Sequence, residues 1–170
     1  MNPFAELTLH IQNRPVTKLS SRQLTSLLNA PLETSAAGVR DRALLQLLSQ
    51  RISLYQLHNL DLKHIDPDAH SLIVPTRSGS QELILLLESA WTRLERWLII
   101  RKLFAVNTEA AFLSLHWTAG RSQPGSRLSE RSMRTIITKY LAQIGAKQPG
   151  ANSLLIAKSA NIPHNRKPPQ

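Results

Sequence analysis

The sequence predicts a mainly helical domain with one small β-hairpin, an α+β fold. Three stretches, 36–53, 88–104 and 129–146, carry apolar residues at the spacing of an amphipathic helix. Between the first two, residues 72–87 form two short apolar runs separated by the turn sequence "RSGS", which is typical of a strand hairpin. Pro75 in the first run favours the edge of a sheet, because proline has no N–H to donate to a neighbouring strand.

The ends of the expected helices carry their own signals. A first helix within 17–31 can be capped by Ser20 or Ser21, and Ser129 can cap the last helix. Gly145 is expected to end that last helix, because glycine adopts the left-handed conformation that follows many helices. In the helix at 88–104, the side chains expected to face the core are Trp91, Leu94, Trp97, Leu98 and Leu103.

Charge is the strongest bulk property of the 170-residue chain. It has 21 Lys+Arg against 11 Asp+Glu, a formal net charge of +10, and a pI of about 10.9. Such a field favours polyanions, of which nucleic acid is the common one, although a merely basic surface is the alternative. The absence of cysteine excludes disulfides, thiolate zinc sites and cysteine nucleophiles. The six histidines lack ligand spacing, so we expect no metal and no cofactor.

The sequence predicts a soluble, cytoplasmic protein with no membrane contact. The start, "MNPFAELTLHIQ", carries Glu6 and lacks the long apolar core of a signal peptide. The longest apolar runs, at 83–87 and 97–100, are far too short to span a bilayer. We expect an N-terminal arm, one folded domain and a basic disordered tail, at residues 1–15, 16–160 and 161–170.

Six stretches, in their order along the chain, resemble the catalytic domain of the tyrosine recombinases, the phage integrase class. They are "VTKLSSRQLTSLLNAP", "GVRDRALLQLL", "LHNLDLKHID", the hairpin at 72–87, "AAFLSL" and "RLSERSMRTIITKYLAQIGA". The resemblance covers roughly residues 15–146. It implies a tyrosine recombinase catalytic-domain fold that is incomplete at the C-terminus.

Members of this family cut DNA by attack of a tyrosine on phosphorus, and two arginines with a lysine or histidines neutralise the phosphate. Phosphoryl transfer needs such clamped charge and a positioned nucleophile. The first arginine of the family lies in a phrase such as T-G-L-R-x-S-E-L, which matches "SQRISLYQL" here. Counting back from "LHNLDLKHID" places that arginine at Ser53. Two residues rotate a helical side chain by about 200°, so Arg51 is either a degenerate first arginine or an ordinary solvated one.

The other catalytic positions are also replaced. The family's hairpin lysine matches Ser78, beside Arg77, which could still touch a phosphate. In the second basic cluster, H-x-L-R-H, Asn152 stands for the histidine and Leu155 for the arginine. The nucleophilic tyrosine is expected farther along, beyond Gln170. The two tyrosines present, Tyr55 and Tyr140, are expected to be structural.

The resemblance therefore implies a DNA-binding protein without its own strand cleavage, acting in or regulating DNA recombination, integration or a mobile element. Its partner would be double-stranded DNA. The residues expected to contact DNA are Arg77, Arg121, Arg127, Arg131, Arg134 and Lys139.

Other functions remain open at this stage. One is a protein-interaction module that binds and regulates a full-length tyrosine recombinase, or another copy of itself, through "SLLIA" at 153–157, although these residues can equally belong to the core. An active recombinase with a tyrosine supplied in trans, a hydrolase of another class and a decaying gene product are further alternatives.

Overall fold

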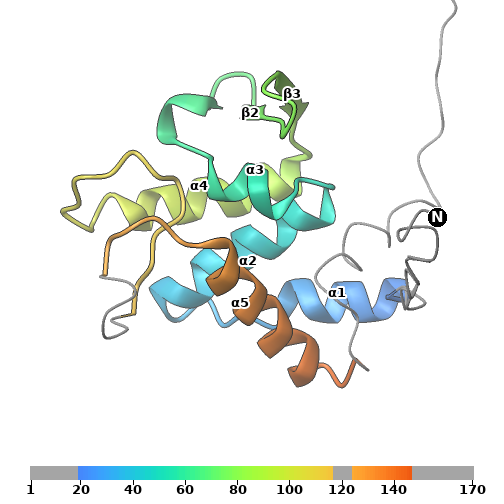
Figure 1. Cartoon of the computed structure of the whole chain (residues 1–170). Coiled ribbons are helices and arrows are strands. Elements are labelled where there is room, and N and C mark those ends of the chain that lie inside the picture. The colour runs from blue at the N-terminus through green and yellow to red at the C-terminus, as the bar shows by residue number, and fades with distance from the viewer. Residues whose placement is uncertain (1–18, 117–123, 147–170) are drawn as a thin grey trace, which may run out of the picture.

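The structure is a computed structural model that describes residues 19–116 and 124–146, and it shows a group of helices with one small sheet at one side (Figure 1). The helices are α1 (Ser21–Asn29), α2 (Ala36–Ser49), α3 (Leu54–His58), the 3₁₀-helix η1 (Leu62–His64), α4 (Glu88–Arg101) and α5 (Glu130–Gln143). The strands are β1 (Ile65–Asp66), β2 (Ser71–Pro75) and β3 (Gln81–Leu85). The predicted α+β class and the hairpin are confirmed, whereas β1 was not predicted.

Serine caps and a glycine stop fix the helix ends, as the sequence predicts. The Ser20 hydroxyl accepts the N–H of Gln23 at 3.2 Å, and the Gln23 side chain accepts the N–H of Ser20 in return. Ser129 caps α5 by accepting the N–H of Ser132 at 3.1 Å. After α5, Gly145 has a φ of 67°, which is the left-handed conformation that glycine adopts without steric cost.

The sheet has the antiparallel order β1-β2-β3, so β2 is its central strand. The prediction that Pro75 marks an edge strand is therefore wrong for the strand as a whole. The reason is local: β1 pairs only with Ser71 and Leu72 at the start of β2, whereas Pro75 lies at the other end, opposite Gln81 of β3. Proline is tolerated there because no strand lies on its other side to receive a hydrogen bond.

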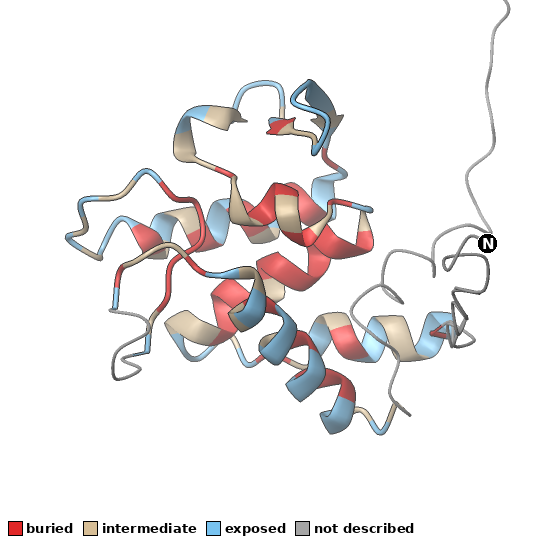
Figure 2. Ribbon diagram, in the orientation of Figure 1, coloured by how far each residue is buried: buried red, intermediate tan, exposed pale blue. Residues whose placement is uncertain are grey.

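Helix α2 is the centre of the core, and α1 and α4 pack against it. Residues 38–41 and 43–49 of this helix are buried (Figure 2), which is the pattern of a helix covered on all sides. At its first turn, a Cβ on Gly38 would lie 1.7 Å from the carbonyl oxygen of Leu32. Only glycine therefore lets the preceding loop approach the helix so closely.

Helix α4 presents Trp91, Leu94 and Trp97 to the core, as predicted. The Trp97 indole also donates a hydrogen bond of 2.8 Å to the carbonyl of Ala111, which satisfies its one polar atom. The prediction for Leu103 is wrong, since its side chain is 82% exposed. Helix α4 ends at Arg101, so the helical spacing that would place Leu103 inward no longer applies.

A buried polar network joins α2, the segment before residue 114, and α5. The Arg40 guanidinium donates to Asp41 Oδ1 at 2.6 and 2.9 Å and to the carbonyl of Leu113 at 3.0 Å. The Tyr140 hydroxyl donates to the other Asp41 oxygen at 3.0 Å. Both charges are buried, so each depends on these partners to offset the loss of water.

Removing the Tyr140 hydroxyl tests this network. Tyr140→Phe leaves one oxygen of the buried Asp41 without its donor, so we expect a loss of about 1–2 kcal/mol in the free energy of unfolding. Urea denaturation at pH 7 measures it. Tyr55→Phe is the matched control: the Tyr55 hydroxyl makes no hydrogen bond to the rest of the described chain, and a change within about 0.5 kcal/mol is expected.

The same variant has a defined pH signature. Burial, and then the charge of Asp41, raise the pKa of Tyr140 from its ordinary 10 to about 12. The folded protein therefore holds the phenol proton more tightly than the unfolded chain does. This stability is complete below pH 10 and is lost as the pH rises from 10 to 12. The gap between wild type and Tyr140→Phe should shrink over that window, and a gap that is unchanged or wider would contradict the network.

Candidate nucleic-acid interface

Helix α5 carries the cations that the sequence singled out for DNA contact. Arg131, Arg134 and Lys139 are all exposed. Arg131 and Arg134 lie one turn apart, where side chains are neighbours on a helix surface. Arg134 is 3.4 Å from Glu130, four residues earlier, but an exposed pair of this kind contributes little and leaves the guanidinium accessible.

Two hollows flank α5 on the side of α2. Arg131 borders one of about 580 Å³, and Lys139 borders one of about 360 Å³. Both hollows are also bordered by Arg40 and His116. The larger one is rich in hydroxyl groups, from Ser114, Ser126, Ser129, Ser132 and Thr135. Two of these hydroxyls already donate within the protein, Ser114 to the carbonyl of His116 and Thr135 to that of Arg131. Arg131, which is exposed beside them, remains a donor that a phosphate oxygen could accept from.

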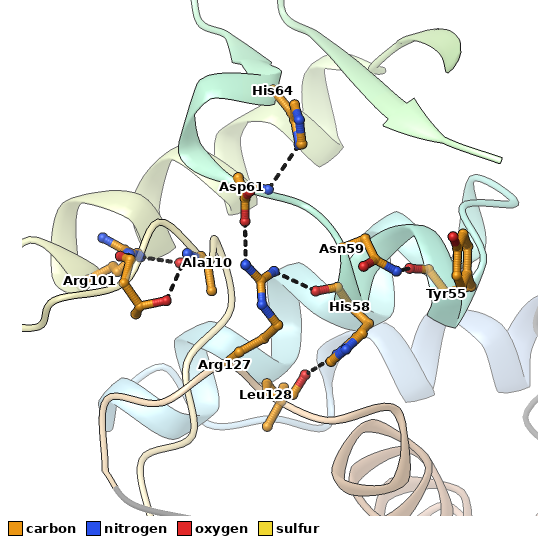
Figure 3. A network of polar contacts seen from close by, with 10 residues as sticks. Tyr55, His58, Asn59, Asp61, His64, Arg101, Ala110, Arg127 and Leu128 are labelled. Atoms are coloured by element: carbon orange, nitrogen blue, oxygen red, sulfur yellow. Dashed lines mark hydrogen bonds and ion pairs between the residues drawn. The ribbon is translucent and has the colours of Figure 1, made fainter. Parts of the chain in front are cut away.

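Arg127 lies beside this surface but has partners inside the protein (Figure 3). Its guanidinium donates to the carbonyl of His58 at 2.7 Å and to Asp61 Oδ1 at 2.5 Å. The His58 imidazole in turn donates from Nδ1 to the carbonyl of Leu128 at 3.0 Å. The Arg127 side chain is 32% exposed. Its main role in the structure is to hold the segment that leads into α5 against the end of α3.

A second arginine, Arg101, fixes the neighbouring segment from within. It donates from Nε to the carbonyl of Ala110 at 2.8 Å and from a terminal nitrogen to the carbonyl of Thr108 at 2.6 Å (Figure 3). Burial lowers the pKa of Arg101, and the charge of Glu109 opposes that effect. Sequence reasoning singled out neither Arg101 nor Arg40 for a structural role, because a buried arginine has the same sequence signal as a solvated one.

The hairpin between β2 and β3 holds Arg77 in a defined place. Its guanidinium carbon lies 4.6 Å from the centre of the Tyr55 ring on α3, a cation–π geometry. Next to it, the Ser78 hydroxyl lies 2.8 Å from that of Thr76, and the correspondence of Ser78 to the family's lysine stays a prediction. The hairpin tip therefore presents one arginine and a cluster of neutral hydroxyls.

The backbone explains the position of Arg51. If Ser53 corresponds to the first arginine, then the glycine of T-G-L-R falls at Arg51, and Arg51 has a φ of 68°, a conformation that favours glycine. Ser53 itself caps α3: its hydroxyl accepts the N–H of Gln56, whose side chain accepts the N–H of Ser53. Arg51 lies exposed in the turn after α2, two residues before Ser53.

Several predicted features fall outside the described residues. They are Arg121, Asn152, Leu155, the segment 153–157, the arm at 1–15 and the tail at 161–170. Within the described ranges, no three of the His, Cys, Asp and Glu side chains are grouped so that they could hold a metal ion. No helix in those ranges has both the length and the apolar character needed to cross a bilayer.

The order of these elements, with a small sheet between α3 and α4 and a capped basic helix at α5, is that of a tyrosine recombinase catalytic domain. The family model for the phage integrase family matches residues 17–155. The chain therefore belongs to the phage integrase family.

Known relatives agree with this assignment. The chain is 35% identical over 127 residues to the tyrosine recombinase XerC of Salmonella typhi and 34% identical over 127 residues to that of Serratia marcescens. Each match covers 74% of this chain but only 36% of the relative, so the chain spans about a third of the length of these curated relatives.

Solved structures show the same fold. The XerA recombinase matches with a TM-score of 0.68 at 18% identity, over 82% of this chain and 47% of that one. The XerH recombinase bound to its difH substrate matches with a TM-score of 0.61 at 17% identity, over 83% and 41%. The predicted catalytic-domain fold is confirmed.

The strained backbone at Arg51 gives a test of its role. Arg51→Gly should raise the free energy of unfolding by about 0.5–1 kcal/mol, because glycine removes the left-handed strain. Arg51→Ala keeps the Cβ and should leave stability nearly unchanged. Thermal denaturation of the two variants distinguishes them. Equal effects of glycine and alanine would mean that the Arg51 side chain, and not its backbone, matters for the fold.

Proposed function

We propose that this chain binds duplex DNA through α5 and the β2–β3 hairpin without cutting it, and acts in DNA recombination or integration in the cytoplasm, as part of a mobile element or as a regulator of one. The observation that carries the proposal is the exposed set Arg131, Arg134 and Lys139 on a helix whose neighbouring hollow is lined by hydroxyls and arginines. The matched XerH structure contains its difH substrate, and a matched lambda integrase dimer is bound to a core site.

Contacts of this kind read the DNA backbone more than the bases. Arginine, lysine and hydroxyl side chains on phosphates fix the position of a protein on the duplex but carry little sequence information. Neutralising about five phosphates would give a log–log slope of affinity against salt of about −4 to −5. Affinity without strong sequence preference suits a chain that has retained the DNA-facing helix of its family.

The same geometry supports the absence of strand cleavage. At the two family positions within the described residues, the hydroxyl of Ser53 is engaged in the cap of α3 and Ser78 lies beside Thr76. Neither position carries the positive charge that a pentacovalent phosphate requires. Tyr140 is buried and donates to Asp41, so it is not available as a nucleophile.

Fluorescence anisotropy with a labelled duplex at several salt concentrations tests the DNA-binding proposal. Arg131→Ala/Arg134→Ala should weaken binding by about tenfold or more and reduce the magnitude of the salt slope by about 2. Arg22→Ala/Lys102→Ala is the matched control, since it removes the same charge from exposed positions on α1 and after α4. We expect it to have a much smaller effect.

Equal losses in the two double variants would mean that binding follows net charge alone, which contradicts a specific surface on α5. Binding no tighter than that of an unrelated basic protein would favour the alternative, a protein-interaction module that regulates a full-length recombinase. A pull-down against such a recombinase would then be the next experiment.

A nicked suicide duplex tests the second half of the proposal. A cutting recombinase becomes trapped on this substrate as a covalent protein–DNA product that survives denaturing gel electrophoresis. We expect no such product from this chain under conditions in which it binds the duplex and in which a full-length tyrosine recombinase gives one. A covalent band that disappears in Tyr55→Phe or Tyr140→Phe would overturn the proposed lack of chemistry.

A further inference from the structure

Arg77 lies in the turn of the β2–β3 hairpin, and its side chain reaches across to α3. The hairpin and α3 are in contact through β2 (Figure 1). The central carbon of the Arg77 guanidinium lies 4.6 Å from the centre of the Tyr55 ring. Arg77 is exposed, whereas Tyr55 is half-buried. The fold therefore places an exposed cation over the face of a ring that belongs to another element.

Two hydrogen bonds hold this ring and the hairpin in place. Gln56, next to Tyr55 on α3, donates from its side-chain amide to the carboxylate of Glu82 on β3 at 3.0 Å. The Asn59 side chain donates to the carbonyl of Tyr55 at 2.8 Å (Figure 3). The contact between Arg77 and Tyr55 thus joins two segments that are already connected.

The contact with the ring leaves the donors of Arg77 unused. A guanidinium has five N–H groups, and its attraction to a ring face depends on its charge rather than on those groups. Within the described part of the chain, no residue accepts a hydrogen bond from Arg77. Arg101 and Arg127, by contrast, donate to backbone carbonyls. Arg77 therefore combines a defined position with available donors, an arrangement that suits a phosphate oxygen.

We propose that Tyr55 is a positioning residue, whose ring holds the Arg77 guanidinium in place to donate to a phosphate of duplex DNA. This inference rests on the proposed binding of DNA through the hairpin. An exposed arginine samples many rotamers, and restricting it on binding costs conformational entropy. Because the ring restricts the guanidinium before DNA is bound, it lowers that cost. Tyr55 thus increases affinity without touching the DNA and without adding charge.

A double-mutant cycle on the full chain tests this coupling, with the anisotropy of a labelled duplex as the readout. Tyr55→Leu removes the ring but keeps an apolar side chain. It should weaken binding by about two- to fivefold, the range of an exposed cation–π contact. Its salt slope should equal that of wild type, because the charge at position 77 is retained. In an Arg77→Ala background, the same substitution should have no effect on binding.

Further variants separate the ring, the charge and the planar guanidinium. Tyr55→Phe keeps the ring and should restore wild-type binding. Arg77→Ala should reduce the salt slope by about 1 and weaken binding more than Arg22→Ala, which removes an exposed charge from α1. Arg77→Lys keeps the charge but lacks the planar group, so it should bind about twofold or more weakly than wild type, with an unchanged slope. This last variant is decisive if circular dichroism shows that Tyr55→Leu is unfolded.

A second readout needs no DNA. The ring current of an aromatic side chain shifts protons that lie over its face upfield. In the NMR spectrum of the free protein, the Hδ protons of Arg77 should show this shift, and Tyr55→Leu should remove it. Hδ protons of Arg77 at the position of an ordinary solvated arginine would contradict the contact on which the proposal depends.

Three binding results would overturn the proposal. Equal weakening by Tyr55→Leu with and without Arg77 would mean that the ring acts only on the fold. Binding by Tyr55→Leu as tight as wild type, or tighter, would mean that the ring gives no help or competes with phosphate for Arg77. An Arg77→Ala variant no weaker than Arg22→Ala would remove Arg77 from the DNA surface. In that case DNA binding through α5 is still judged separately, by Arg131→Ala/Arg134→Ala.

Discussion

The buried pair Arg40–Asp41 is the interaction on which the rest of the structure depends. It lies in the first half of the central helix α2 and reaches two other parts of the chain, the Leu113 carbonyl and the Tyr140 hydroxyl on α5. Burying two charges is costly unless every donor and acceptor has a partner. All of these hydrogen bonds form together only when α2, the 110–114 segment and α5 lie in this one arrangement. The buried pair therefore destabilises other arrangements that apolar packing alone would allow.

Two sets of cations among the described residues have different physical roles. Arg40, Arg101 and Arg127 donate to backbone carbonyls inside the protein, where the planar guanidinium satisfies several acceptors at once. Arg131, Arg134 and Lys139 remain at the surface of α5. The first group positions the helix that displays the second. The net charge therefore overstates the positive charge that the surface presents. The formal net charge of +10 is no measure of the number of phosphate contacts.

Local signals made much of the fold predictable from the sequence. The serine caps at Ser20 and Ser129, the glycine at the end of α5 and the turn between β2 and β3 act within a few residues, so the sequence carries their full information. The environments of Leu103 and Pro75 differ from the prediction because they depend on where α4 ends and how far β1 extends. For the candidate site, exposure of the α5 cations follows from helix periodicity. The hydrogen-bond partners of Arg127 are His58 and Asp61, which lie far from it in the sequence. No local sequence pattern indicates these contacts.

At two positions of this chain, Ser53 and Ser78, the side chain stabilises the local fold and lacks the positive charge that phosphate chemistry needs. Ser53, the predicted counterpart of the family's first arginine, caps α3 through a reciprocal pair of hydrogen bonds with Gln56. A serine is among the best residues for that cap, and an arginine has no acceptor with which to make it. In the hairpin, Ser78 joins the hydroxyls of Thr76 and Ser80, and the turn depends on Gly79 with its φ of 87° rather than on a lysine. The helix cap and the hairpin turn at these two positions therefore form without a charged side chain. Helix α5 is held by Arg40, Asp41, Tyr140 and Arg127, none of which lies at those two positions.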